Sequence, residues 1–218
     1  MLAVSFETTN AEAIPVKSLV SCANFAGTTS LGDGADQIWT YSQADGWKKY
    51  FYYKRGATAG WRAQGTSTAL GDDVKVSAGT AVFFVRATGS AATTLTLSGG
   101  VVDLSSVKNV EVAAGETKLI CNPWPMDIKI ADFSNYYASG SVPAGTTSIG
   151  DGADQIWLYD QSTGWSKYYY YKRGANLRWC AQGSTTSVAD DVVIPAGKGF
   201  FFVRATGSAQ ATLSFSAK

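Results

Sequence analysis

The fold is decided by the stretch ADQIW at residues 35–39, because it opens a pattern that returns as ADQIW at residues 153–157. The likeness extends in both directions, and residues 28–98 match residues 146–216 without a gap at a constant offset of 118 residues. Of these 71 aligned positions, 45 carry the same amino acid. So close an internal copy predicts two domains of one fold in tandem.

The length of the chain supports this division. With 218 residues, each copy has about 100 residues, which is enough for one hydrophobic core. We therefore expect a first β-module at residues 1–99 and a second at residues 100–218. Because residues 118–121 resemble residues 18–21, we interpret a segment around residues 123–144 as a loop inserted into the second module.

Short apolar runs separated by turn residues fill both copies. The runs at residues 82–85 and 200–203 are apolar on both faces, which is typical of central strands buried from two sides. Asp45 and Gly46 form a hairpin signal between two aromatic-rich runs. Strands this short and this evenly spaced predict an all-β fold, with a β-sandwich or a barrel in each module.

Charge and composition narrow the possible functions. The 18 Lys and Arg residues nearly cancel the 17 Asp and Glu residues, so no long-range field attracts nucleic acid or an anionic membrane. The sequence has no histidine, which removes the commonest general base and metal ligand. No run of 18 apolar residues is present to span a membrane. We expect a protein that is not an enzyme and that has no cofactor, no nucleic-acid partner and no membrane span.

Compartment and cysteine pairing are less defined by the sequence. The start Met1-Leu2-Ala3 has neither a basic residue nor an apolar h-region, so the protein is cytosolic or its signal peptide has been removed. We favour an extracellular or cell-surface location, because a weakly charged, Thr-, Ser- and Gly-rich chain suits a surface protein. The cysteines lack the CxxC spacing of metal sites. We expect Cys22 and Cys121 in buried strands, and Cys180 either bonded to Cys121 or free.

Acidic residues stand beside turn glycines in both copies. Asp is common in turns because its side chain bonds the nearby backbone, and we favour this structural explanation. If their loops meet in space, the same carboxylates are weak candidates for calcium ligands. A glycosidase pair is a further hypothesis, although duplicated catalytic carboxylates are uncommon. The candidates are Asp33, Asp36, Asp72, Asp73, Asp151, Asp154, Asp190 and Asp191.

The aromatic runs at residues 50–53 and 168–171 are the strongest feature of the chain. On a strand they place two rings on each face. We favour the hypothesis that one face fills the core while the other stacks across strands. The alternative is an exposed platform for sugars or for a neighbouring subunit. The candidates for such contacts, the first three in an alternating N-terminal strand, are Leu2, Val4, Phe6, Trp124, Tyr136, Tyr137, Tyr169 and Tyr171.

The order of these motifs resembles a repeat found in secreted and cell-surface proteins of environmental bacteria. The matching motifs are DQIW, GW, a tyrosine run, a tryptophan, and DDVVIPAGKGFFF at residues 190–202. The run LICNP at residues 119–123 looks like the opening of the same repeat, and the first copy lacks its Asn-Pro pair. The resemblance implies export and a surface role, and it transfers no catalytic residue.

These features predict a non-enzymatic extracellular structural protein that assembles with copies of itself into a fibre, a pilus-like filament or a surface layer. Head-to-tail contacts between repeated modules propagate when they do not close into a ring. The N-terminal segment is a candidate for pairing with a sheet edge of the next subunit. The alternative is a carbohydrate-binding cell-surface protein that uses the aromatic candidates. We expect Arg86 and Arg204, just beyond the Phe runs, to bond strand-end carbonyls or carboxylates.

Overall fold

The structure is a computed structural model that describes residues 2–3, 14–15, 17, 22, 24–30, 32, 34–66, 74–76, 80–95, 107–122, 124–150 and 152–215. We use first half for residues 1–99 and second half for residues 100–218. The elements of the first half are β1 (Leu2–Ala3), β2 (Ile14–Pro15), β3 (Gln37–Ser42), β4 (Gly46–Arg55), β5 (Thr58–Ala63), β6 (Lys75–Val76) and β7 (Ala81–Val85). Those of the second half are β8 (Lys108–Val112), β9 (Thr117–Cys121), β10 (Ile128–Lys129), the 3₁₀-helix η1 (Ile130–Tyr136), β11 (Gln155–Asp160), β12 (Gly164–Arg173), β13 (Asn176–Ala181), β14 (Val193–Ile194), β15 (Gly199–Val203) and β16 (Ala211–Phe215).

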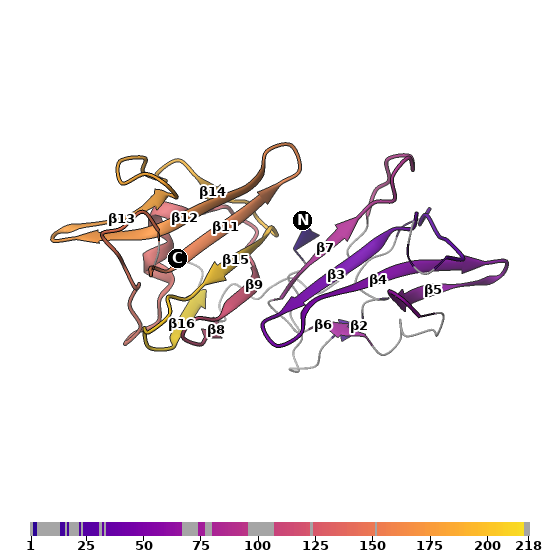
Figure 1. Ribbon diagram of the computed structural model, residues 1–218, viewed down its shortest axis with the longest axis horizontal. Helices are drawn as coiled ribbons and strands as arrows, with labels where there is room; N and C mark the ends of the chain where they lie inside the picture. Colours follow the sequence, from indigo (N-terminus) through magenta and orange to yellow (C-terminus); the bar gives the residue numbers. More distant parts are fainter. Residues whose placement is uncertain are drawn as a thin grey trace.

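Two five-stranded antiparallel sheets form the body of the molecule, one in each half (Figure 1). The strand order is β1-β7-β3-β4-β5 in the first half and β9-β15-β11-β12-β13 in the second. Each strand of one sheet therefore has a counterpart at the same place in the other. Two-stranded sheets accompany them, β2–β6 in the first half and β10–β14 and β8–β16 in the second. The predicted all-β class is confirmed, and the division into two independent domains stays a prediction.

Each large sheet is built around a hairpin that the sequence marks clearly. The β3–β4 pairing ends at Ser42 opposite Gly46, where φ of the glycine is 68°. The β11–β12 pairing ends in the same way at Asp160 opposite Gly164, where φ is 78°. Glycine adopts a positive φ without steric cost, which suits this place in a three-residue loop. The predicted hairpin at Asp45 and Gly46 is therefore confirmed.

The apolar runs of the sequence form inner strands. β7 lies between β1 and β3, and β15 lies between β9 and β11. Val82 and its counterpart Phe200 are fully buried on one face, while Phe83 and Phe201 are buried on the other. The prediction that these strands are covered from both sides is confirmed.

The core of the second half lies between its large sheet and a cover made of β8, β16, β10, β14 and η1. Phe133 of η1 is at its centre, fully buried, with its ring 5.7 Å from that of Phe200 and 5.8 Å from that of Trp179. Leu213 and Phe215 of β16 are fully buried in the same cluster. This arrangement of a sheet and an opposing cover is sandwich-like.

The register of the first strand in each sheet corrects the expectation of an inserted loop. The β1–β7 and β9–β15 pairings match at the offset of 118 residues, with Cys121 in the place of Ala3. Farther along, Thr146 bridges β12 where Thr28 bridges β4. Both halves have the same length of chain between these points, so the segment around residues 123–144 has a counterpart of equal length in the first half.

The N-terminal strand pairs within its own chain. Leu2 lies opposite Val82 of β7, in place of the expected contact with a neighbouring subunit. Val4 and Phe6, the other two candidates of that segment, lie outside the described residues. Cys121 ends β9 and is buried, as predicted, but the prediction is wrong for Cys22, which is partly exposed and outside any strand.

Candidate functional site

Aromatic rings line the face of each large sheet that is turned away from its core. Trp39 and Tyr41 are alternate residues of β3, so their side chains share this face. Tyr41 lies opposite Trp47 of β4, and Trp39 lies opposite Phe83 of β7. At the offset of 118 residues the second sheet presents the same set: Trp157, Tyr159, Trp165 and Phe201.

The two aromatic faces pack against each other, so that a tyrosine of each half contacts the phenylalanine of the other half. The ring of Tyr41 lies 5.1 Å from that of Phe201 at 89°, and the equivalent pair of Tyr159 and Phe83 lies 5.9 Å apart at 64°. A tryptophan from each half also contacts the phenylalanine of the other, at 5.8 and 6.3 Å. The contact is thus close to two-fold symmetric, as isologous interfaces are. We call the following six residues the aromatic junction: Tyr41, Trp47, Phe83, Tyr159, Trp165 and Phe201.

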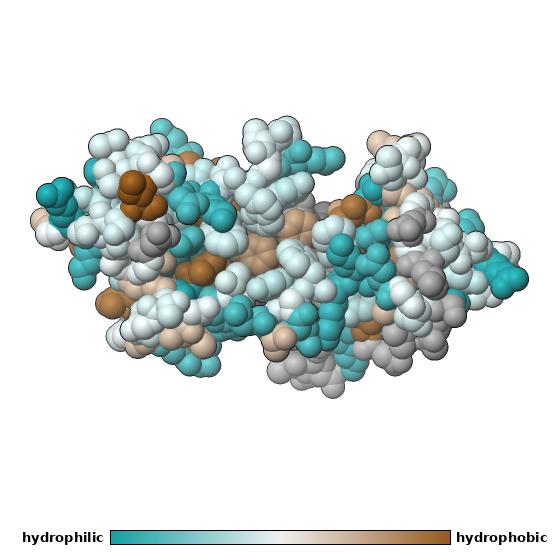
Figure 2. Space-filling model, viewed as in Figure 1, coloured by the Kyte–Doolittle hydropathy of each residue, from teal (hydrophilic) through white to brown (hydrophobic). Residues whose placement is uncertain are grey.

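Strand β9 extends the junction on one side. Leu119 and Cys121 are buried in the same cluster as the two junction phenylalanines. The amide of Thr117 donates a hydrogen bond to the Gln43 side-chain oxygen at 3.1 Å, joining the start of β9 to the β3–β4 turn. Figure 2 shows a hydrophobic area in the middle of the molecule, where the two halves meet. The junction therefore combines ring contacts with an apolar centre.

The junction also leaves aromatic surface open to solvent. Trp47 is 40% exposed and Trp165 is 43% exposed. Beside them, the ammonium group of Lys49 lies 4.0 Å above the Trp39 ring, and the equivalent lysine of the second half lies 3.9 Å above Trp157. These cation–π contacts hold Trp39 and Trp157 in place, and each contributes about 0.5–1 kcal/mol at such a site.

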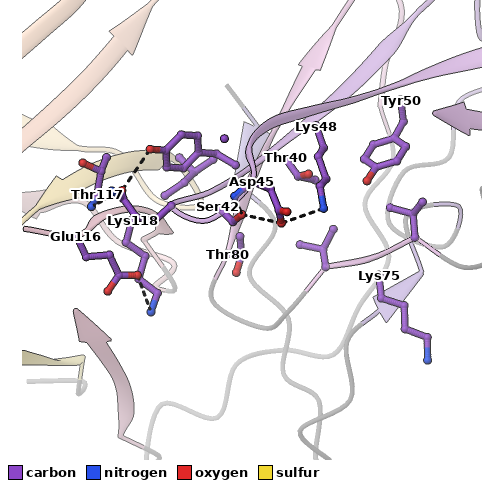
Figure 3. A pocket seen from close by; sticks show the side chains of 16 residues that line it. Thr40, Ser42, Asp45, Lys48, Tyr50, Lys75, Thr80, Glu116, Thr117 and Lys118 are labelled. Carbon is purple, nitrogen blue, oxygen red and sulfur yellow. Dashed lines mark hydrogen bonds and ion pairs between the residues drawn. The ribbon is translucent and has the colours of Figure 1, made fainter. Parts of the chain in front are cut away.

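A cleft of about 350 Å³ lies beside the junction, between the first sheet and the start of β9 (Figure 3). Its lining mixes the rings of Tyr41 and Tyr50 with hydroxyl, carboxylate and ammonium groups. Lys48 Nζ lies 2.9 Å from Asp45 Oδ2, and Ser42 Oγ lies 3.0 Å from the same oxygen. These hydrogen bonds, that of Lys48 foremost, hold the pKa of Asp45 below its ordinary value, and the bond to Asp45 raises the pKa of Lys48.

Asp154 and Arg204 form a buried ion pair that ties loops to the second sheet. The Asp154 carboxylate accepts hydrogen bonds from Arg204, from the Tyr137 hydroxyl at 2.6 Å, and from two backbone amides at 3.0 and 2.9 Å. Arg204 also donates to two backbone carbonyls, at 3.1 and 2.8 Å. The predicted role of this arginine is confirmed. Burial, and then the neighbouring Asp154 charge, raise the pKa of Tyr137 well above its ordinary value.

Among the described residues, the first half repeats the pair with fewer contacts. Asp36 accepts from Arg86 and from two backbone amides at 2.9 Å each. The side chain of Arg86 is 24% exposed, whereas that of Arg204 is 3% exposed. No hydroxyl in the described part of the first half donates to Asp36 as Tyr137 donates to Asp154. Both ion pairs tie loops to their own sheet, and the pair of the second half is more deeply buried.

The calcium candidates are dispersed in the structure. Asp36 and Asp154 are buried and bonded to arginines, as described above. Asp190 and Asp191 are exposed, and the described residues contain no group of three Asp, Glu or Cys placed to hold a metal ion. Four of the eight candidates lie outside the described residues: Asp33, Asp72, Asp73 and Asp151.

Several of the aromatic contact candidates are buried. Trp124 is 3% exposed in the core of the second half, and Tyr169 and Tyr171 are buried beside Cys180. Tyr136 and Tyr137 are partly buried and pack against that core. Trp124, Tyr169 and Tyr171 are therefore not available to a glycan or a subunit on the surface, whereas Tyr136 and Tyr137 keep part of their surface exposed.

The cysteines are all free in the structure, so the suggested bond between Cys121 and Cys180 is absent. Burial raises the pKa of the Cys121 thiol to about 12 and also raises that of Cys180. Both thiols are therefore protonated at neutral pH and unreactive as nucleophiles.

Sequence reasoning missed the aromatic junction as a candidate site. None of its six residues is among the contact candidates, because the tyrosine runs at residues 50–53 and 168–171 are the longer aromatic signal. The signal was present: Trp39 and Tyr41 alternate with the buried Ile38, so their face is the one opposite the core, and the second copy repeats it. Rings on a non-core face, present in duplicate, indicate a second buried contact.

Comparison with protein-family models, with curated proteins and with solved structures finds no match to this chain. The resemblance to a repeat of secreted bacterial proteins therefore stays a prediction. Among the described residues, no helix has the length and apolar character needed to cross a membrane.

Proposed function

We propose that this protein is a non-enzymatic structural subunit that assembles with copies of itself at the cell surface or outside the cell. The observation that carries the proposal is that edge strands of the two large sheets lie at opposite ends of the molecule (Figure 1). The aromatic junction, in which a sheet face of one half binds the same face of the other, joins the two halves within one chain. Because the junction is already satisfied there, contacts between chains need other surfaces.

The two outermost strands offer such surfaces. β5 and β13 are the edge strands of the large sheets, and they lie at opposite ends of the molecule (Figure 1). Part of β13 is covered, since Cys180 bridges Val188. Its first residues, Asn176–Arg178, have no second strand partner among the described residues, and Leu177 there is 54% exposed. An edge of this kind accepts a further strand.

Pairing of β13 in one copy with β5 in the next links unlike surfaces. Such a heterologous contact can be repeated without limit, because each added copy leaves one edge strand unpaired. Ala59 of β5 and Leu177 of β13 are counterparts at the offset of 118 residues and lie at corresponding places on the two edges. A fibre or a layer follows from repetition of this contact.

Electron microscopy with light scattering at several protein concentrations tests the proposal. We expect regular filaments or sheets, and loss of assembly in Leu177→Lys or Ala59→Lys, because a charged side chain on an edge opposes strand addition. The matched control is Val142→Lys, at an exposed loop position away from both edges, which should assemble normally. A monomer at all concentrations contradicts the proposal.

Carbohydrate binding is the second candidate function, and the cleft beside the junction favours it. Sugars are bound by aromatic rings together with hydrogen-bonding side chains, and a volume of about 350 Å³ suits a small ligand. Tyr50→Ala and Lys48→Ala should then abolish retention on a glycan array while leaving assembly unchanged. Retention by both variants at the level of the unmodified protein contradicts this function.

A further inference from the structure

Strand β8 closes the core of the second half by pairing with β16. In this pairing Val112 lies opposite Ala211, and Val110 lies opposite Leu213. Ala211, Leu213 and Val112 are fully buried, and Val110 packs against the same core. The contribution of β8 is therefore an extended segment whose apolar side chains alternate with polar ones and point inward.

In the first half, the described residues include the acceptor of this contact but not the strand. At the offset of 118 residues, Thr93 and Leu95 take the places of Ala211 and Leu213. Leu95 packs against the first core, as its counterpart does in the second, but it is only partly buried. Residues 91–95 belong to no strand, and none of the described strands pairs with them.

The repeat shows which strand this place lacks among the described residues. β1 is the counterpart of β9, the strand that directly follows β8, and no described strand of the first half takes the place of β8. β8 itself is occupied by β16. The 218 residues thus present two acceptor segments of the same kind and a described partner for the second one only.

We propose that residues 91–95 form an acceptor site for a β-strand donated by a separate polypeptide. The donor is an extended segment with little net charge and apolar side chains at alternate positions, like Val110 and Val112 of β8. It pairs antiparallel to the acceptor in the register of β8 on β16 and covers Leu95, in the manner of strand-addition complexes. The site is independent of the edges β5 and β13 and therefore goes beyond the proposed assembly contact.

A synthetic peptide with the sequence of residues 107–113 is the probe for this site. Added to the full chain, it should bind one to one, raise the melting temperature, and slow amide hydrogen exchange at residues 91–95. The control peptide carries Ser at the positions of Val110 and Val112 and should bind at least tenfold more weakly. Absence of binding overturns the proposal, as does protection that appears at residues 211–215 in place of residues 91–95.

Two protein variants locate the bound peptide. Leu95→Asp should weaken binding at least tenfold while circular dichroism shows an intact fold, and unchanged affinity overturns the proposal. Thr94→Cys, in a Cys22→Ser background, should form a disulfide with a peptide that carries Cys at position 111, since Glu111 lies opposite the counterpart of Thr94. A peptide with Cys at position 110 should react at least tenfold more slowly, and equal rates contradict the predicted register.

Discussion

The two halves of the molecule share one sheet but bury it to different depths. Phe202 is fully buried in the second half, while its counterpart Phe84 is only partly buried in the first. The same holds for Tyr170 against Tyr52. Because the strand order and register agree, the difference arises from what packs on the sheet and not from the sheet itself.

The described residues of the first half do not form a full equivalent of the cover of the second half. Phe133 of η1 fills the centre of the second core, and β8 and β16 close it. In the first half Phe25 approaches the same place, with its ring 4.7 Å from Tyr52 and 5.3 Å from Trp61, but it is only partly buried. Repeated strands thus specify a sheet, whereas burial is specified by the segments that differ between the copies.

The largest expected difference is between Phe133→Ala and Phe25→Ala. Loss of a fully buried phenylalanine removes its burial and leaves a cavity, so Phe133→Ala should cost about 3–5 kcal/mol of unfolding free energy. Phe25→Ala should cost about 1.5 kcal/mol, because that ring is partly solvated already. Urea unfolding followed by tryptophan fluorescence measures both. Equal costs would mean that the two cores are equally closed.

The buried ion pairs provide the second comparison. Asp154→Asn should cost about 3–5 kcal/mol, because it leaves the guanidinium of Arg204 buried without a counter-charge. Asp36→Asn should cost about half as much, since water reaches Arg86. Urea unfolding measures both costs. Asp190→Asn, at an exposed position, is the control and should change the free energy of unfolding little. A larger cost for Asp36→Asn contradicts the difference in burial between the two arginines.

Tyr137 gives the second half a dependence on alkaline pH that the described contacts of Asp36 do not give the first. Its pKa is raised in the folded state, so its contribution to stability is complete below the unfolded tyrosine pKa of about 10 and is lost as the pH rises above that value. Tyr137→Phe should cost about 1 kcal/mol at pH 7 and should reduce the loss of stability between pH 9 and pH 11, roughly the range around that pKa. Unfolding titrations across this range test it. An unchanged alkaline profile in the variant would exclude Tyr137 as the source.

The sequence predicted the elements whose signals are local. The hairpin glycines, the alternation of β3 and the apolar runs of β7 and β15 each determine a strand or a turn from a few adjacent residues. The roles of the two arginines followed from their places just beyond buried strands. All of these lie within the repeated stretch, where two copies of the same pattern gave the same answer.

The remaining features depend on contacts between distant segments. Trp124 was a candidate for surface contacts because it lies in the expected inserted loop, yet tertiary packing buries it. The inserted loop was inferred from the likeness of residues 118–121 to residues 18–21, but sheet register makes β9 the counterpart of β1 instead. Register and burial are set by which strand lies alongside, and a short apolar run does not carry that information.

The smallest expected effects concern the junction, where the two halves should behave alike. A double-mutant cycle of Tyr41→Ala and Phe201→Ala should give a coupling of about 0.5–1.5 kcal/mol, as aromatic pairs do beyond their area burial. The cycle of Tyr159→Ala and Phe83→Ala should give a similar value, because the two pairs are related by the repeat. Tyr41→Ala with Phe133→Ala is the control, since Phe133 lies in the core of the second half on the other side of its sheet, and should show no coupling. Coupling in one aromatic pair without the other would mean that the junction is not symmetric. Absence of coupling in both would mean that the halves do not pack through these rings, and the arrangement that places the β5 and β13 edges at opposite ends of the molecule would then have to be abandoned.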